Sequence, residues 1–149
     1  MTKIYYFSGT GNSLWSAKEI ARITGGALFN IGAEAHKDQM TIEADAVVIV
    51  FPSYAYGLPL IVRRWVKTAV FKTPYLAALV TYGSSPGGTL GALRRLLKGK
   101  GIARMFFGRI PAVENYLAMF GPPKAQTLER RVLMQEKATA QAALAIMER

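Results

Sequence analysis

Nearly continuous apolar runs recur along the chain and alternate with stretches of helical spacing. Residues 4–7, 46–51 and 76–82 hardly alternate between apolar and polar side chains, which is typical of strands buried on both faces. Parallel strands need crossover connections, and right-handed crossovers place helices on both faces of a sheet. The sequence therefore predicts an α/β fold with a parallel doubly wound sheet. Two further strands, residues 27–31 and 102–107, bring the expected number to five.

The stretches between the apolar runs predict helices, because their apolar residues recur at helical spacing. The first of them is followed by Gly25 and Gly26, which can adopt the left-handed conformation that ends many helices. The segment 31–41 is polar and rich in turn-forming residues, so we expect a flexible loop there. The predicted helices cover residues 13–23, 59–69, 88–98 and about the last 25 residues.

Length and composition fit one compact domain. The chain has 149 residues, of which 51% are hydrophobic, enough to bury a core and too many for a disordered tail. We expect residues 1–149 to form a single domain. No run reaches the roughly 18 apolar residues of a membrane-spanning helix, and the first residues lack the layout of a signal peptide. The expected location is the cytoplasm.

Cysteine is absent and His36 is the sole histidine of the sequence. The chain itself therefore cannot supply a disulfide framework, a thiolate-held iron-sulfur cluster or a cysteine nucleophile. One histidine also cannot build a multi-histidine zinc site. No metal site is expected.

A loop rich in glycine and hydroxyl groups follows the first predicted strand and leads directly into a helix. Its sequence is Ser8-Gly9-Thr10-Gly11-Asn12-Ser13. Glycine lets backbone N–H groups turn inward, the side chains add donors, and the helix N-terminus carries a partial positive charge. These properties predict a phosphate-binding loop.

Specific residues weaken two nucleotide-binding interpretations of this loop and exclude a receiver domain. A Walker A loop needs a lysine that the chain lacks here, and the dinucleotide-binding pattern needs a third glycine where Leu14 stands. A receiver domain would need carboxylates after the first and third strands, where this chain has Ser8-Gly9 and Pro52-Ser53.

Two further loops combine aromatic side chains with glycine. Pro52-Ser53-Tyr54-Ala55-Tyr56-Gly57-Leu58-Pro59 follows the third predicted strand, and Thr81-Tyr82-Gly83-Ser84-Ser85-Pro86-Gly87-Gly88 follows the fourth. Ligands collect at the carboxyl ends of parallel strands, where all three loops meet. A phosphate site beside two aromatic walls suits a flat ring system with a phosphate tail. FMN has this shape.

The three loops resemble those of the flavodoxin family, and especially those of flavodoxin domains fused to ferredoxin-type modules. The resemblance spans residues 3 to about 120. It implies a flavodoxin-like three-layer α/β/α sandwich with a five-stranded parallel sheet in the order 2-1-3-4-5. The FMN-binding residues that it implies are Ser8, Gly9, Thr10, Gly11, Asn12, Ser13, Pro52, Ser53, Tyr54, Ala55, Tyr56, Gly57, Thr81, Tyr82, Gly83, Gly87 and Gly88.

The function that the resemblance implies is electron transfer by bound FMN. An electron carrier needs no catalytic acid or base, because the cofactor performs the redox chemistry. An FMN-dependent oxidoreductase acting on a quinone or another small acceptor is the alternative. A third hypothesis, from a different class, is an interaction module without a cofactor.

Basic residues exceed acidic ones by 19 to 9, and 15 of the 19 follow residue 60. Flavodoxins are usually strongly acidic, so this chain departs from the family. A positive field favours acidic partners, and we expect a redox partner protein with an acidic docking surface. Nucleic acid is not expected, because no RNA-binding signature, zinc motif or recognition helix is present. The helices bearing Arg63, Arg64 and Lys67 and bearing Arg94, Arg95 and Lys98 are expected on the same sheet face.

Overall fold

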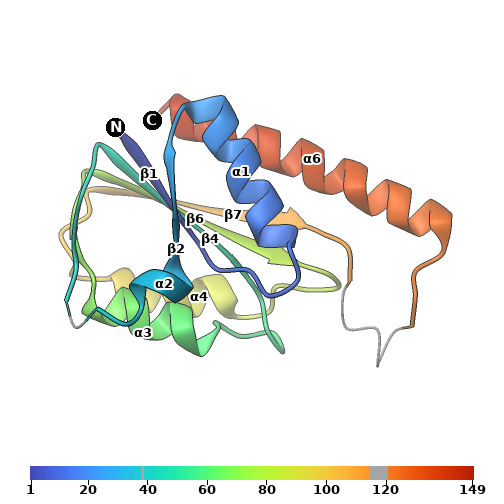
Figure 1. The fold of residues 1–149 in the computed structure, drawn as a ribbon, viewed down its shortest axis with the longest axis horizontal. Coiled ribbons are helices and arrows are strands. Elements are labelled where there is room, and N and C mark those ends of the chain that lie inside the picture. Colours follow the sequence, from blue (N-terminus) through green and yellow to red (C-terminus); the bar gives the residue numbers. More distant parts are fainter. Residues whose placement is uncertain (38, 115–120) are drawn as a thin grey trace.

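The computed structural model describes residues 1–37, 39–114 and 121–149. Its main sheet has five parallel strands in the order β2-β1-β4-β6-β7 (Figure 1). Counted along the chain within this sheet, the order is 2-1-3-4-5, so the predicted topology is confirmed. The strands are β1 (Thr2–Tyr6), β2 (Ala27–Asn30), β4 (Ala46–Pro52), β6 (Tyr75–Tyr82) and β7 (Arg104–Pro111).

Helices cover both faces of this sheet, which confirms the three-layer sandwich (Figure 1). α1 (Asn12–Thr24) and α6 (Ala125–Met147) pack on one face through side chains such as Ile20 and Ile146. α3 (Leu60–Thr68) and α4 (Thr89–Leu97) pack side by side on the other. All four helices lie where the sequence predicts them. None of the described helices is both long and apolar enough to span a bilayer.

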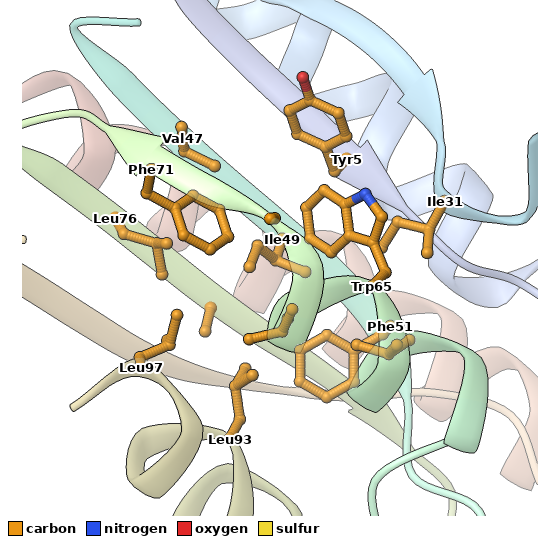
Figure 2. Packing of buried hydrophobic residues seen from close by; sticks show 14 of the residues in the cluster. Tyr5, Ile31, Val47, Ile49, Phe51, Trp65, Phe71, Leu76, Leu93 and Leu97 are labelled. Carbon is orange, nitrogen blue, oxygen red and sulfur yellow. The ribbon is translucent and has the colours of Figure 1, made fainter. Parts of the chain in front are cut away.

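The core between α3 and the sheet is rich in aromatic side chains (Figure 2). The ring centroids of Tyr5 and Trp65 lie 4.9 Å apart, and Phe71 meets Trp65 edge to face at 5.9 Å. Burial raises the pKa of the Tyr5 phenol to about 12. This packing fixes α3 against the sheet and thereby fixes the start of α3, which follows one of the predicted site loops.

The prediction of a flexible loop over residues 31–41 is wrong for its first four residues. They form α2 (Ile31–Glu34), which is capped because the Gly32 N–H donates to the Asn30 side chain at 2.8 Å. Ile31 is fully buried, so its contacts outweigh the polar character of its neighbours. Residue 41 begins β3 (Thr41–Glu43), which pairs with β5 (Val70–Lys72) in a second, two-stranded sheet. Residue 38 of this predicted loop lies outside the described residues.

The fifth strand runs from residue 104 to residue 111, rather than from 102 to 107 as predicted. It continues through Gly108, which pairs with Leu79 of β6. A Cβ atom at Gly108 would lie 2.6 Å from Leu79 Cδ2, so glycine allows the two strands to pack closely here. The longer strand carries Val113 and Glu114 to the edge of the sheet where the site loops meet.

Candidate functional site

A cavity of about 600 Å³ lies at the carboxyl ends of β1, β4 and β6. Small-molecule sites span roughly 300–1,000 Å³, so its size suits a ligand as large as a nucleotide. The structure brings the three predicted loops together around it. The predicted residues that line it are Ser8, Gly9, Thr10, Asn12, Ser13, Pro52, Ser53, Tyr54, Ala55, Tyr56, Thr81, Tyr82 and Gly83.

The loop before α1 presents the start of this helix to the cavity. Gly11 is the N-cap residue with φ of 102°, and it has no side chain to cap the first N–H groups. Its own N–H donates to Ser8 Oγ at 3.1 Å, which folds the loop back on itself. The first turn of α1 contains no acidic residue. The partial positive charge of the helix N-terminus therefore faces the cavity and can attract an anionic ligand.

Three hydrogen bonds fasten this loop to distant parts of the chain. Ser13 Oγ lies 2.8 Å from Thr81 Oγ1 at the end of β6, and both residues are buried. The Asn12 side-chain amide donates to the Val113 carbonyl at 3.0 Å. Gln135 of α6 donates to the Asn12 carbonyl at 3.1 Å. The loop is therefore held from the sheet, from the β7 connection and from the last helix.

Gln135 belongs to a buried polar cluster between α1 and α6. Its amide also donates to Ser16 Oγ at 3.1 Å, and Thr139 donates to the same oxygen at 3.2 Å. Sequence analysis missed Gln135, because a glutamine in an amphipathic helix is usually exposed. The spacing of Gln135, Thr139 and Ala142 places them on one side of the helix, which indicates that Gln135 shares their buried stripe. All three residues are buried.

The tyrosine-bearing loop folds as a tight turn over residues 54–57. The Tyr54 N–H donates to the Gly57 carbonyl at 3.0 Å, and the reverse bond measures 2.9 Å. The central residues Ala55 and Tyr56 have φ of 46° and 62°, in the left-handed region that L-residues rarely adopt. Both residues line the cavity. Backbone strain is thus located at the candidate site.

The two tyrosines of this turn occupy different positions. The Tyr54 ring meets Phe7 edge to face with centroids 6.0 Å apart, and a Cβ atom at Gly9 would overlap the Tyr54 hydroxyl. Burial raises the pKa of the Tyr54 phenol, and a hydrogen bond with the Gly9 backbone opposes that shift. Tyr56 is 60% exposed. Tyr54 therefore forms a wall against the loop before α1, whereas Tyr56 stands at the rim.

The third loop is attached to the tyrosine-bearing loop. Ser53 Oγ donates to the Pro86 carbonyl at 3.1 Å and lies 2.8 Å from Thr89 Oγ1. A Cβ atom at Gly87 would lie 2.5 Å from Tyr56 Cβ, so glycine is needed for this contact. The two loops consequently form one continuous side of the cavity.

Four of the predicted site glycines do not line the cavity. Gly11 and Gly88 are the N-cap residues of α1 and α4, Gly57 closes the tight turn, and Gly87 packs on Tyr56. They shape the loops rather than form the surface of the cavity. The lining residues that were not predicted are Ser84, Ser85, Val113 and Glu114.

Glu114 is the one carboxylate among the described lining residues. A Cβ atom at Gly83 would overlap its carboxylate, so glycine at position 83 makes room for it. No motif points to Glu114, because the strand expected from the sequence ends at residue 107, four residues before the end of β7. Described lysine and arginine side chains do not contribute to the lining, so the donors facing a ligand are backbone N–H groups, hydroxyls and amides.

Solved structures of similar fold match nearly the whole chain. A flavodoxin from the domain Archaea is 15% identical with a TM-score of 0.55, and the match covers 95% of this chain and 97% of that one. An FMN-dependent NADH-azoreductase from Bacillus anthracis, in complex with FMN, is 8% identical with a TM-score of 0.66, covering 99% and 98%. The two-electron reduced Megasphaera elsdenii flavodoxin is 17% identical with a TM-score of 0.52, covering 95% and 99%.

These likenesses show that the chain has the flavodoxin-like fold. No protein-family model matches the sequence, and no curated protein matches it significantly.

Proposed function

We propose that this chain is an FMN-binding electron-transfer protein. The observation that carries the proposal is the uncapped start of α1 facing a cavity that Tyr54 and Tyr56 also line. A helix N-terminus suits an anion, and tyrosine side chains suit a flat ring. FMN combines both parts in one molecule.

For the phosphate of FMN we assign Ser8, Thr10, Asn12 and Ser13, together with the backbone N–H groups at the start of α1. The donor set is neutral, so recognition of the phosphate depends on hydrogen bonds and the helix N-terminus rather than on a cationic side chain. The three bonds that fasten this loop to Thr81, Val113 and Gln135 keep these donors in place before a ligand arrives.

For the ring we assign the two joined loops. Pro52, Ser53 and the turn 54–57 cover one face of the ring, and Gly87 supports Tyr56. Thr81, Tyr82 and Gly83 border an edge of the ring, and Gly88 starts α4. Bound FMN supplies one- and two-electron redox chemistry. The Tyr54 ring limits the access of water to the flavin ring, and Glu114 places one carboxylate group at the cavity wall.

The similar solved structures support this cofactor, since one of them is an FMN-dependent enzyme in complex with FMN and two are flavodoxins. The resemblance of the loops to flavodoxin domains of flavodoxin-ferredoxin fusion proteins favours a carrier. As its partner we propose a redox protein with an acidic docking surface, because the chain carries a net charge of +10.

An FMN-dependent oxidoreductase acting on a quinone or another small acceptor is the second candidate. The observation in its favour is the 60% exposure of Tyr56 at the rim of the cavity, which a small acceptor could reach. Steady-state reduction of a small quinone by NADH, dependent on added FMN, would support the oxidoreductase. An FMN-loaded protein that exchanges electrons with redox proteins but does not turn over NADH would support the carrier.

Fluorescence titration with FMN and riboflavin tests the proposal. We expect FMN to bind about 100-fold more tightly, because hydrogen bonds to a charged group contribute about 1.5–3 kcal/mol each. The absorbance spectrum of freshly purified protein provides an independent check for bound flavin. Equal affinity for both ligands would contradict the phosphate assignment. Failure to bind either flavin would favour an interaction module without a cofactor.

A further inference from the structure

A long stretch of the chain is rich in basic side chains and contains no acidic ones. From residue 46 to residue 113 the sequence contains ten lysines and arginines and no aspartate or glutamate. α3 and α4, which lie side by side on one face of the sheet (Figure 1), carry or adjoin six of these residues. We call them the basic face: Arg63, Arg64, Lys67, Arg94, Arg95 and Lys98, all exposed.

The basic face is held rigidly. Lys100 donates to the carbonyls of Lys67 and Ala69 at 3.2 and 2.8 Å, which joins the end of α4 to the end of α3. Its burial lowers the pKa of its ammonium group. The guanidinium of Arg94 lies 4.7 Å from the centroid of the Phe107 ring. The two helices that carry these charges are therefore fixed relative to each other before a partner binds.

The charged side chains of the basic face are exposed and form none of the ion pairs found among the described residues. The ion pairs among the described residues join Arg22 to Glu19, Lys37 to Glu34 and the N-terminus to Asp45. No residue of the basic face takes part in them. Its field can therefore attract an approaching acidic surface.

The two helices that carry the basic face start at the rim of the candidate site. The turn 54–57 leads through Pro59 into α3, and residues 84–88 lead into α4. These two segments also contact each other where Gly87 packs on Tyr56. A protein seated across α3 and α4 would thus lie beside the exposed Tyr56.

We infer that the basic face is the docking surface for an acidic electron-transfer protein. The inference rests on the proposed function, because it takes the cavity beside this face to hold the redox cofactor. Complementary charge speeds the encounter of redox proteins and fixes their orientation. Single-stranded nucleic acid is disfavoured, because neither α3 nor α4 exposes an aromatic side chain on which a base could stack.

Native and succinylated cytochrome c are suitable probes, because they share one haem and differ in the sign of their surface charge. The FMN-loaded protein is reduced with dithionite, freed of excess reductant and mixed with either ferric cytochrome. Each haem takes one electron, Fe(III) becoming Fe(II), and stopped-flow absorbance follows its rate. We expect the succinylated form to react about tenfold faster at low salt, with the difference shrinking as salt rises.

Two charge-matched variants locate the docking surface. The first replaces Arg63, Arg64, Arg95 and Lys98 with glutamine, leaving Arg94 on Phe107. The control replaces Lys18, Lys124, Arg130 and Lys137, which are also exposed and lie on or next to α1 and α6. We expect the first variant to lose about tenfold in rate with the succinylated cytochrome and the control less than about twofold. Equal losses, or salt-independent rates, would overturn the inference.

Binding of the flavin-free protein separates this inference from the proposed function. We expect succinylated cytochrome c to shift amide resonances of α3 and α4 in the NMR spectrum, and the first variant to lose these shifts. If these shifts occur but FMN does not bind, the proposed function fails, and the basic face remains a docking surface for an acidic protein without a redox role. If FMN binds and the shifts fall elsewhere, the docking surface fails alone. Retention of single-stranded RNA by the basic face, without discrimination between the two cytochromes, would also overturn it.

Discussion

The two sides of the cavity are held in opposite ways. The loop before α1 is fastened to distant parts of the chain, through Ser13 to Thr81, through Asn12 to Val113 and through the Asn12 carbonyl to Gln135. The turn 54–57 is closed by its own two backbone hydrogen bonds, and both of its central residues have positive φ. The loop before α1 is a fixed set of hydrogen-bond donors. The turn 54–57 has a strained backbone and lines the same cavity.

This difference suggests separate contributions to ligand binding. Donors held in place before binding lose little entropy when a ligand arrives. A left-handed conformation costs an L-residue about 1–2 kcal/mol, so the turn can change its conformation at little cost or even with a gain. We expect the loop before α1 to determine affinity for the phosphate, and the turn to adjust to the ring.

Replacing Thr10 with valine should have the largest effect, because it removes one hydroxyl donor from the fixed side. We expect FMN affinity to fall about tenfold, the lower end expected for a hydrogen bond to a charged group, with riboflavin affinity unchanged. Paired fluorescence titrations measure both. Thr127→Val, at an exposed position of α6, is the matched control. A parallel loss for both flavins would show that Thr10 supports the loop and does not contact phosphate.

Gln135→Leu should weaken the attachment of the fixed side. The substitution removes the α6 donor from the part-buried Asn12 carbonyl and from the buried Ser16 Oγ, at a cost of about 1–2 kcal/mol in the free energy of unfolding. Urea denaturation measures the loss. Gln141→Leu on the exposed side of the same helix should change stability by less than about 0.5 kcal/mol. Similar effects of the two variants would mean that the polar cluster does not hold α1.

Tyr56→Ala tests the opposite side of the cavity. Losing one aromatic contact should cost about 1 kcal/mol of flavin affinity, roughly fivefold. Because the contact is with the ring, riboflavin and FMN should lose affinity equally, in contrast to Thr10→Val. Leu60→Ala, 69% exposed at the start of α3, controls for loss of exposed apolar surface. A loss confined to FMN would place Tyr56 near the phosphate instead.

Much of the fold and most of the cavity lining could be predicted because they depend on local sequence. β4 and β6 are buried on both faces, and their nearly unbroken apolar runs identify them. Once the strands are known, parallel topology brings the loops that follow them to one edge. The position of the cavity therefore follows from the order of the strands alone.

The parts that sequence analysis missed depend on tertiary contacts. The pairing of Gln135 exists because α6 docks on α1. Glu114 reaches the cavity because β7 continues through Gly108, a residue that normally weakens a strand. Positive φ at Ala55 and Tyr56 could not be predicted either, since tight hairpin turns of this kind favour asparagine and glycine.

Ala55→Gly should have the smallest effect of these substitutions and the opposite sign. At φ of 46° glycine relieves about 1–2 kcal/mol of steric cost, while its more flexible unfolded chain removes about 0.5–1 kcal/mol of that gain. We expect the free energy of unfolding to rise by about 0.5 kcal/mol in urea denaturation. Ala140→Gly, within α6, should instead lower it by about 1 kcal/mol. If both variants destabilise the protein by the same amount, the turn carries no strain. The two sides of the cavity would then differ only in the hydrogen bonds that hold them.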